Sequence, residues 1–238
     1  MLFQAKDIRA GYGDVVIIDG VSINVASGDL VVIVGPNGSG KSTLLKSLVG
    51  LTRLFSGEIF YGEKNLTKVP TWRLIGVGVG YVPQVNNVFA KLTVQENLDM
   101  GAYCIKDKER VKLAIRRTYE KFPELDARKS ALAETLSGGE RQLLAIARAM
   151  MPNPKMLLLD EPLAFLSPKA SNKILNKLVE IKDSGTSILM VEQNAIKSLK
   201  LASYGYIISE GKCAMEGRGE ELLADESMKE RFLGLSVN

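Results

Sequence analysis

The feature that most constrains the fold is a glycine-rich segment between a wholly apolar run and a helix-forming one. Residues 30–34 read Leu-Val-Val-Ile-Val, which is typical of a strand covered on both faces. Residues 35–42 read Gly-Pro-Asn-Gly-Ser-Gly-Lys-Ser. From Lys41 to Val49 apolar residues recur at helical spacing, and Gly50 stands where a C-terminal cap belongs. The sequence therefore predicts a buried strand, a loop and a helix in that order.

Two later apolar runs, Met156 to Leu159 and Ser187 to Val191, also precede stretches with helical spacing. This repetition predicts a mostly parallel sheet with helices on its faces. Several short β-rich runs occupy residues 1–34. Near the C-terminus, the runs 204–209 and 213–216 predict a hairpin, which a helix over residues 220–233 would follow.

The middle third of the chain has a different pattern. Thr93 to Glu96 and Ser137 to Glu140 match the capping-box spacing, so each predicts the start of a helix. The second of these helices would end before Pro152. No repeat, low-complexity tract or linker divides the sequence, and we expect one continuous domain with an insertion.

Composition excludes several kinds of site. The chain has no histidine, which removes imidazole catalysis and His-ligated metals. Cys104 and Cys213 match no metal-binding spacing, so two reduced thiols are expected. The net charge of +4 is too small to indicate nucleic acid as a partner. No run approaches the roughly 18 apolar residues that span a bilayer, so any action at a membrane requires a partner protein.

The segment 35–42 matches the phosphate-binding pattern of a glycine, four residues and Gly-Lys-Ser. Glycines let successive backbone N–H groups point at phosphate oxygens, and the following helix adds its positive end. Lys41 would reach the β and γ oxygens, while the Ser42 hydroxyl suits Mg²⁺. A plain glycine-rich turn is the alternative. The residues expected to bind nucleotide here are Gly35, Pro36, Asn37, Gly38, Ser39, Gly40, Lys41, Ser42 and Thr43.

The apolar run that ends at Asp160 and Glu161 supplies the acidic half of such a site. Asp160 would hold Mg²⁺ through water, and Glu161, where the strand stops, would turn toward the attacking water as general base. Taken alone, two acids at a strand end are also typical of a solvated turn. Because the phosphate loop precedes them, the functional interpretation is favoured.

Residues 136–142 read Leu-Ser-Gly-Gly-Glu-Arg-Gln, and with this signature the chain resembles the ATPase subunits of ATP-binding cassette (ABC) transporters. The resemblance extends over essentially the whole chain. It implies a single α/β P-loop NTPase domain over residues 1–238, with a mostly parallel sheet and an N-terminal antiparallel β-subdomain. Residues 1–85 and 152–238 would form the nucleotide-binding core, and residues 86–151 the inserted helical signature subdomain.

The resemblance also implies that the signature of one subunit binds the nucleotide of another, so that two chains enclose two ATP molecules. Ser137, Gly138 and Gly139 would make this contact. Tyr12, between two glycines, would stack on adenine, although a lone surface tyrosine is otherwise typical of simple packing. Gln84 would touch Mg²⁺ or the attacking water.

Two positions depart from the family pattern. Ser167 stands where the loop after Glu161 usually ends in aspartate, which removes a carboxylate expected to couple the two subunits. Gln193 stands at the usual histidine of the switch region. Its amide can donate a hydrogen bond to the γ-phosphate but carries no ionisable proton, so Glu161 would act as base without imidazole.

Residues 78–84, 92–98 and 191–194 are most similar to the smaller ATPase subunits of branched-chain (hydrophobic) amino-acid importers. ATP and Mg²⁺ are then the implied cofactors. The implied partners are transmembrane permease subunits, a second ABC ATPase subunit in a homo- or heterodimer and, indirectly, a substrate-binding protein. The implied location is peripheral, at the cytoplasmic face of the cell membrane.

A soluble ABC ATPase that is not coupled to transport is the alternative function. Repair members carry a long coiled-coil insertion and translation members usually two cassettes, and 238 residues leave room for neither. A GTPase is disfavoured because residues 176–179 read Asn-Lys-Leu-Val and lack the aspartate that reads guanine. An apolar groove for a permease helix, formed after Gln84, would favour the transporter.

Overall fold

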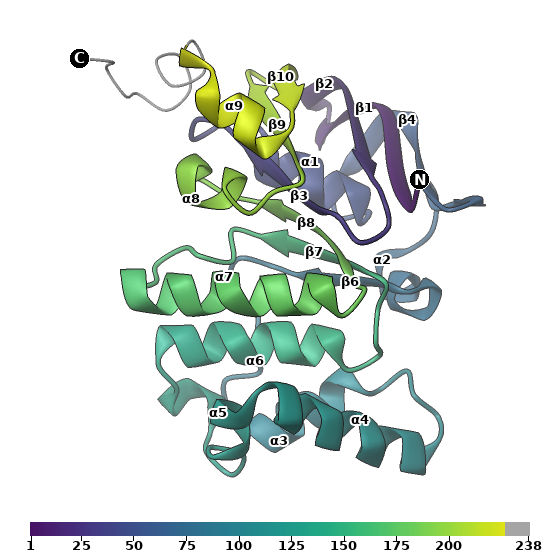
Figure 1. Cartoon of the computed structure of the whole chain (residues 1–238). Helices are drawn as coiled ribbons and strands as arrows, with labels where there is room; N and C mark the ends of the chain where they lie inside the picture. The colour runs from purple at the N-terminus through teal and green to yellow at the C-terminus, as the bar shows by residue number, and fades with distance from the viewer. Residues whose placement is uncertain (227–238) are drawn as a thin grey trace.

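Two β-sheets organise the protein, and the computed structural model describes residues 1–226. From top to bottom, Figure 1 shows an antiparallel sheet, a larger sheet, a pair of long helices and a group of further helices. The predicted α/β architecture, with a mostly parallel sheet and an N-terminal antiparallel part, is confirmed.

The six-stranded sheet positions the ends of three buried strands next to one another. Its strands in spatial order are β10 (Lys212–Gly217), β9 (Tyr204–Ser209), β3 (Leu30–Val34), β8 (Ser187–Val191), β7 (Met156–Asp160) and β6 (Val79–Val82). All neighbours are parallel except β9 and β10. Because β3, β8 and β7 are buried at every position, their sequences are almost uniformly apolar. The segments that follow these strands meet at one edge of the sheet.

The four-stranded sheet is antiparallel and has one buried face. Its strands in spatial order are β2 (Val15–Val25), β1 (Phe3–Tyr12), β4 (Arg53–Tyr61) and β5 (Lys64–Asn65). The β1–β2 pairing runs from Phe3 opposite Val25 to Tyr12 opposite Val15. Tyr12 therefore lies beside the tight turn of this hairpin.

Helix α1 (Lys41–Leu48) is packed between the two sheets. Leu44 and Leu45 belong to one hydrophobic cluster with Val31 and Ile33 of β3 and with inward side chains of β1 and β2. Packing on both sides holds the helix, and with it the loop that precedes it, in a fixed position relative to β3. The helix predicted after the glycine-rich loop is confirmed.

The opposite face of the six-stranded sheet is covered by α6 (Gly138–Met150) and α7 (Pro168–Asp183), which lie side by side in Figure 1. Val32 and Val34 of β3 cluster there with Ile146 and Ile174. Since successive side chains of a strand point to opposite faces, the single strand β3 contributes to both hydrophobic clusters.

Between β6 and β7 the chain is mostly helical, as predicted. The elements before α6 are α3 (Val94–Gly101), α4 (Lys108–Lys121), α5 (Pro123–Asp126) and a 3₁₀ turn at Ala133–Thr135. Thr93 and Ser137 cap α3 and α6 through complete capping boxes, which confirms both predictions. A short helix, α2 (Thr71–Leu74), and a 3₁₀ turn at Ile75–Val77 precede β6.

At the C-terminal side, β9 and β10 form the predicted hairpin, and α8 (Ala195–Leu199) and α9 (Gly219–Ala224) flank it in sequence. The helix predicted over residues 220–233 ends at Ala224 in the described part, and its residues 227–233 lie outside the described ones. Cys104 and Cys213 are both free. No helix within residues 1–226 combines the length and the apolar character needed to cross a bilayer.

The position of α1 between the sheets predicts a large stability effect. Leu45 is fully buried, so Leu45→Ala is expected to lower the free energy of unfolding by about 2–5 kcal/mol. Leu51→Ala, at a leucine that is 49% exposed, is the matched control and should cost less than about 1 kcal/mol. Urea denaturation followed by circular dichroism measures both, and equal effects would contradict the packing described for α1.

Candidate functional site

The glycine-rich loop joins β3 to α1, and its shape requires glycine at several positions. Gly35, Gly38 and Gly40 have φ angles of 152°, 77° and 100°, a region that other residues rarely adopt. A Cβ on Gly35 would also lie 2.0 Å from the carbonyl oxygen of Ile208 in β9. No side chain caps α1, so the first N–H groups of this helix are free to meet an anion.

Lys41 is buried at the start of α1, and its ammonium group closes the loop. Its Nζ donates hydrogen bonds to the carbonyl oxygens of Gly35 and Pro36, at 2.9 and 2.8 Å. Burial lowers the pKa of Lys41, while the nearby Glu161, Asp160 and Glu192 carboxylates act in the opposite direction. A flexible ammonium group held by loop carbonyls can exchange them for phosphate oxygens.

Asp160 ends β7 as a buried carboxylate that lacks ligands. It is 1% exposed, and neither carboxylate oxygen has a hydrogen-bond partner among residues 1–226. Burial raises the pKa of Asp160, an effect that the nearby Ser42 hydroxyl and Lys46 partly offset. Lys46 Nζ lies 3.9 Å from Oδ2. Two unpartnered carboxylate oxygens beside a hydroxyl fit a hard divalent cation.

The residues around Asp160 do not form a complete metal cage. Within residues 1–226 no group of three or more His, Cys, Asp or Glu side chains is placed to hold a metal ion. Mg²⁺ is typically bound by one or two protein ligands together with water and substrate phosphates. The donors present therefore fit a cation that arrives with a nucleotide.

Glu161 follows Asp160 immediately and is turned out of the strand. Its backbone has a φ angle of 46°, which ends the extended conformation at this residue. Gln84 Nε2 and Gln193 Nε2 both donate hydrogen bonds to Glu161 Oε2, at 2.7 and 2.8 Å. The structure thus brings together the three side chains that the sequence placed in catalytic roles.

A cavity of about 450 Å³ joins these groups to the loop. The predicted site residues that line it are Tyr12, Asn37, Gly38, Gly40, Lys41, Ser42, Thr43, Gln84, Glu161 and Gln193. Ile17, which the sequence analysis did not single out, also lines it. The ring of Tyr12 is half exposed at this cavity, so a flat base could stack on it.

Besides Asp160, which is buried at the end of β7, six predicted site residues do not line this cavity. They are Gly35, Pro36, Ser39, Ser137, Gly138 and Gly139. The first three belong to the loop itself, where the carbonyls of Gly35 and Pro36 hold Lys41. The other three form the start of α6, and one copy of the chain does not bring them to its own phosphate loop.

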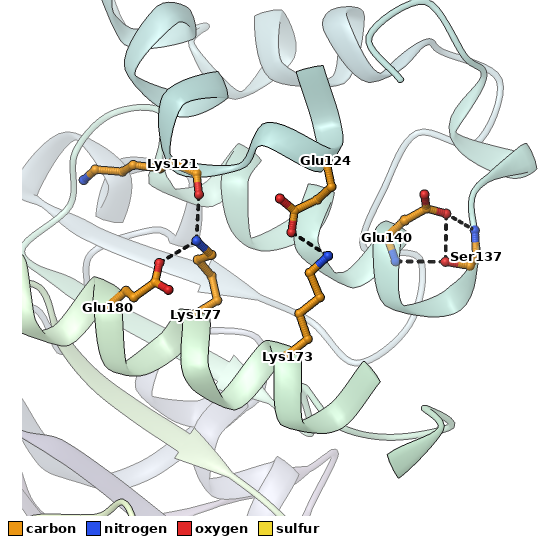
Figure 2. A network of polar contacts seen from close by, with 7 residues as sticks. All are labelled: Lys121, Glu124, Ser137, Glu140, Lys173, Lys177 and Glu180. Carbon is orange, nitrogen blue, oxygen red and sulfur yellow. Dashed lines mark hydrogen bonds and ion pairs between the residues drawn. The ribbon is translucent and has the colours of Figure 1, made fainter. Parts of the chain in front are cut away.

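Figure 2 shows how the start of α6 is held. Ser137 N–H and its hydroxyl both donate to Glu140 Oε2 at 2.8 Å, and Glu140 N–H donates back to Ser137 Oγ at 3.3 Å. Hydrogen bonds from the Ser137 backbone and hydroxyl lower the pKa of Glu140. Lys173 of α7 pairs with Glu124 of α5 at 2.9 Å in the same view. The hydrogen bonds between Ser137 and Glu140 therefore close a complete capping box at the start of α6.

Glu192, the residue that follows β8, belongs to none of the roles predicted from the sequence. It is 3% exposed, and its Oε1 accepts a hydrogen bond from Leu163 N–H at 2.9 Å. Burial raises the pKa of Glu192 to about 7, despite hydrogen bonds from the backbone of Leu163 and Gln193. An acid directly after a wholly apolar strand was the available signal, but its burial could not be read from the sequence.

The raised pKa of Glu192 predicts a pH-dependent stability. The folded protein keeps this proton up to about pH 7, whereas an unfolded chain releases it near the ordinary value of 4.5. The folded state therefore binds more protons between these values, and the free energy of unfolding falls as pH rises through this window, by up to about 3 kcal/mol. The raised pKa of Asp160 acts in the same direction.

Glu192→Gln keeps an oxygen that can accept from Leu163 and removes the charge. It is expected to match the wild type near pH 5 and to be about 1–3 kcal/mol more stable near pH 8. Urea denaturation at both pH values measures this difference. Glu109→Gln, at an exposed side chain of α4, is the control and should leave the pH dependence unchanged. A Glu192→Gln profile parallel to that of the wild type would rule out the titration.

Comparisons with known proteins agree with this geometry. The family model described as "ABC transporter" matches residues 18–164. The chain is 41% identical to the probable branched-chain amino acid transport ATP-binding protein LivF of Archaeoglobus fulgidus, covering 98% of this chain and 99% of the relative. It is 38% identical to the high-affinity branched-chain amino acid transport ATP-binding protein BraG of Pseudomonas aeruginosa, covering 94% and 95%.

A solved structure is also similar to this chain over nearly its whole length. An ATP-binding cassette of an ABC transporter, in its ADP conformation, matches with a TM-score of 0.86 and 32% sequence identity, over 96% of this chain and 97% of that one. A likeness this complete in sequence and in fold places the chain in the ABC transporter family, among its ATP-binding cassettes.

Proposed function

We propose that this chain is the ATP-hydrolysing subunit of a membrane importer for branched-chain or other hydrophobic amino acids. The observation that carries the hydrolytic part is the pair of amide hydrogen bonds that aim Glu161 at the loop cavity. The substrate class is supported by the printed functions of the LivF and BraG relatives. The glycine-rich loop after β3 supports the ATP-binding part of the proposed function.

Nucleotide binding is assigned to the residues that line the cavity. The base stacks on Tyr12, and the phosphates lie on the N–H groups of residues 37–43. Lys41 leaves its loop carbonyls and neutralises the β and γ oxygens. Ser42, Gln84 and, through water, Asp160 would hold Mg²⁺, which supplies neutralisation of phosphate charge.

Hydrolysis is assigned to Glu161 as general base. Its Oε2 accepts two amide N–H groups, which leaves Oε1 to take a proton from a water molecule. Gln84 and Gln193 orient the carboxylate, and neither can take up the proton itself. Gln193 instead stabilises the γ-phosphate by donating an amide hydrogen bond. Within the proposed site, Glu161 is thus the group that takes up the proton.

A second subunit is required because the signature turn lies outside the cavity of its own chain. We assign Ser137, Gly138 and Gly139 to the nucleotide of a second ABC ATPase subunit, whose own turn completes the site described here. The Ser137 hydroxyl donates to Glu140 in the free chain and must turn to the γ-phosphate on pairing. ATP would therefore join two chains, and loss of the γ-phosphate would release them.

An apolar groove supports a permease as the membrane partner. A hollow of about 480 Å³ is lined in part by Trp72, Phe89, Met100 and Tyr103, all of them exposed. Such a gathering of exposed apolar side chains marks a protein interaction site. Tyr81 also lines this groove and lies three residues before Gln84, so the segment that follows β6 connects the groove to the nucleotide cavity.

The groove also bears on the division of the chain. We propose that residues 86–151 act as a helical subdomain that forms the permease groove together with residues 71–81, whereas residues 1–85 and 152–238 form the nucleotide-binding core. The chain would then be peripheral, at the cytoplasmic face of the membrane, with a substrate-binding protein as an indirect partner. A soluble ABC ATPase that is not coupled to transport would not need a groove for a permease. We therefore rank that function second.

Purification from membranes tests the transport function. A tagged chain isolated from detergent-solubilised membranes of its source organism is expected to retain an integral membrane protein. Isolation with ribosomes or DNA as the only partners would favour the soluble alternative.

A charge placed in the groove should weaken this association. Met100→Glu places a carboxylate at a side chain that is 47% exposed, so binding of an apolar helix is expected to weaken at least tenfold. Leu113→Glu, at a leucine of α4 that is 43% exposed, is the matched control and should retain the membrane protein. Equal recovery with both variants would mean that the groove is not the docking site.

Substitution of Glu161, the proposed base, should stop ATP hydrolysis and leave ATP binding intact. Glu161→Gln keeps an oxygen that can accept from Gln84 and Gln193 but cannot take a proton, so steady-state ATP hydrolysis is expected to fall about 10²–10⁴-fold. The variant should accumulate as an ATP-bound dimer, measured by light scattering during size-exclusion chromatography with MgATP. Near-normal hydrolysis by this variant would remove Glu161 from the role.

A further inference from the structure

Tyr81 lies in β6, and its side chain belongs to two parts of the protein at once. The residue is partly buried, and it forms part of the wall of the apolar groove. Its hydroxyl oxygen, in contrast, is fully buried and has no hydrogen-bond partner among residues 1–226. A tyrosine hydroxyl usually has a partner when it is buried. A place in the groove wall therefore does not account for this hydroxyl.

Strand register places Tyr81 on the same face of the sheet as Asp160. Strands β6 and β7 are parallel neighbours (Figure 1), and Tyr81 pairs with Leu158. Leu158 belongs to the hydrophobic cluster that contains α1, and Tyr81 packs against this cluster. Because side chains alternate along a strand, Asp160, two residues after Leu158, also points to the α1 side. The distance of 3.9 Å from Lys46 Nζ in α1 to Asp160 Oδ2 agrees with this placement.

Tyr81 and Asp160 share the same shortage of hydrogen-bond partners. Among residues 1–226, five buried side-chain oxygens have no partner, and three of them belong to these two residues. The shortage is thus concentrated near the ends of two neighbouring strands. A protonated hydroxyl can donate, whereas a carboxylate only accepts, so the two groups are complementary although no direct hydrogen bond joins them. A water molecule between them would satisfy the hydroxyl and one carboxylate oxygen.

The charges near Tyr81 favour its hydroxyl as a donor. Burial raises the pKa of Tyr81, and the Asp160 carboxylate and Tyr12 act in the same direction. The hydroxyl therefore keeps its proton at neutral pH. Asp160 is the carboxylate assigned above to hold Mg²⁺ through water, and Mg²⁺ usually keeps several water molecules when it is bound. A donor just outside the metal ligands fixes how such a water molecule is oriented.

We propose that Tyr81 is a positioning residue of the magnesium site, whose hydroxyl donates a hydrogen bond to the water molecule that Asp160 shares with Mg²⁺. The proposal rests on the function put forward above and adds a side chain that has no part in the hydrolysis described there. The same side chain then joins the groove to the metal site. A permease helix in the groove would contact the residue whose hydroxyl serves Asp160.

The test compares Tyr81→Phe with the unaltered full chain, because phenylalanine keeps the ring and removes only the hydroxyl. A non-hydrolysable ATP analogue is titrated by calorimetry, once with excess Mg²⁺ and once with a chelator. The ratio of the two dissociation constants measures how much Mg²⁺ strengthens binding. In Tyr81→Phe this ratio is expected to fall about tenfold, the lower end of what outer partners of metal ligands contribute to metal affinity. Binding without Mg²⁺ should be unchanged.

Two further measurements separate this role from a structural one. Without nucleotide, the unfolding temperature of Tyr81→Phe is expected to equal or exceed that of the unaltered chain, because the hydroxyl has no protein partner to lose among residues 1–226. Tyr81→Phe should also retain the integral membrane protein on purification, because the ring in the groove is kept. Tyr204→Phe, at a partly buried tyrosine of β9 that lines neither the groove nor the loop cavity, is the matched control and should leave all three measurements unchanged.

The outcomes distinguish this proposal from the proposed function. An unchanged magnesium ratio in Tyr81→Phe overturns the positioning role and leaves the proposed function intact. Loss of the membrane protein with an unchanged ratio overturns it too, because the hydroxyl would then serve the groove. A lower unfolding temperature together with weaker binding in the absence of Mg²⁺ would identify a structural role instead. An unaltered chain that binds no nucleotide overturns the proposed function itself.

Discussion

A single buried lysine lies among three carboxylates, and the site depends on the balance of these charges. Asp160 ends β7 and Glu161 follows it, Glu192 follows the adjacent strand β8, and Lys41 follows the loop after β3. Burial lowers the pKa of Lys41 and raises those of Asp160 and Glu192. A magnesium-bound triphosphate would bring both a cation for the acids and an anion for the lysine. The groups are thus arranged for a ligand that carries both positive and negative charge.

The sheet explains how so much charge is tolerated inside an apolar fold. Side chains along β3 alternate between two hydrophobic clusters, and the packing on both sides makes the strand ends rigid. Gln84 and Gln193 lie 77 and 32 residues from Glu161 in sequence, yet both reach the same carboxylate oxygen. Two neutral amide donors thus fix the direction of this carboxylate, and a defined direction is what proton transfer requires.

Local chemistry made much of this protein predictable from its sequence. The buried strands, the loop after β3 and the capping boxes at Thr93 and Ser137 depend on residues close together in the chain, and the structure has them where they were expected. Glu192 and Tyr81 were not singled out from the sequence for a common reason. One is an acid that is buried and the other a tyrosine whose hydroxyl is buried, and burial depends on residues far away in the sequence.

The amino-acid sequence by itself determined the phosphate loop, because three glycines and a lysine at this spacing permit few backbone shapes. It also determined that this chain offers no imidazole to the site, since its sequence contains no histidine. Only the tertiary structure decided that Gln84 and Gln193 share one oxygen of Glu161, that Asp160 is buried without a hydrogen-bond partner among residues 1–226, and that the signature turn lies away from the loop of its own chain. These relations join distant segments, and they exist only once packing of the two hydrophobic clusters has brought the strand ends together.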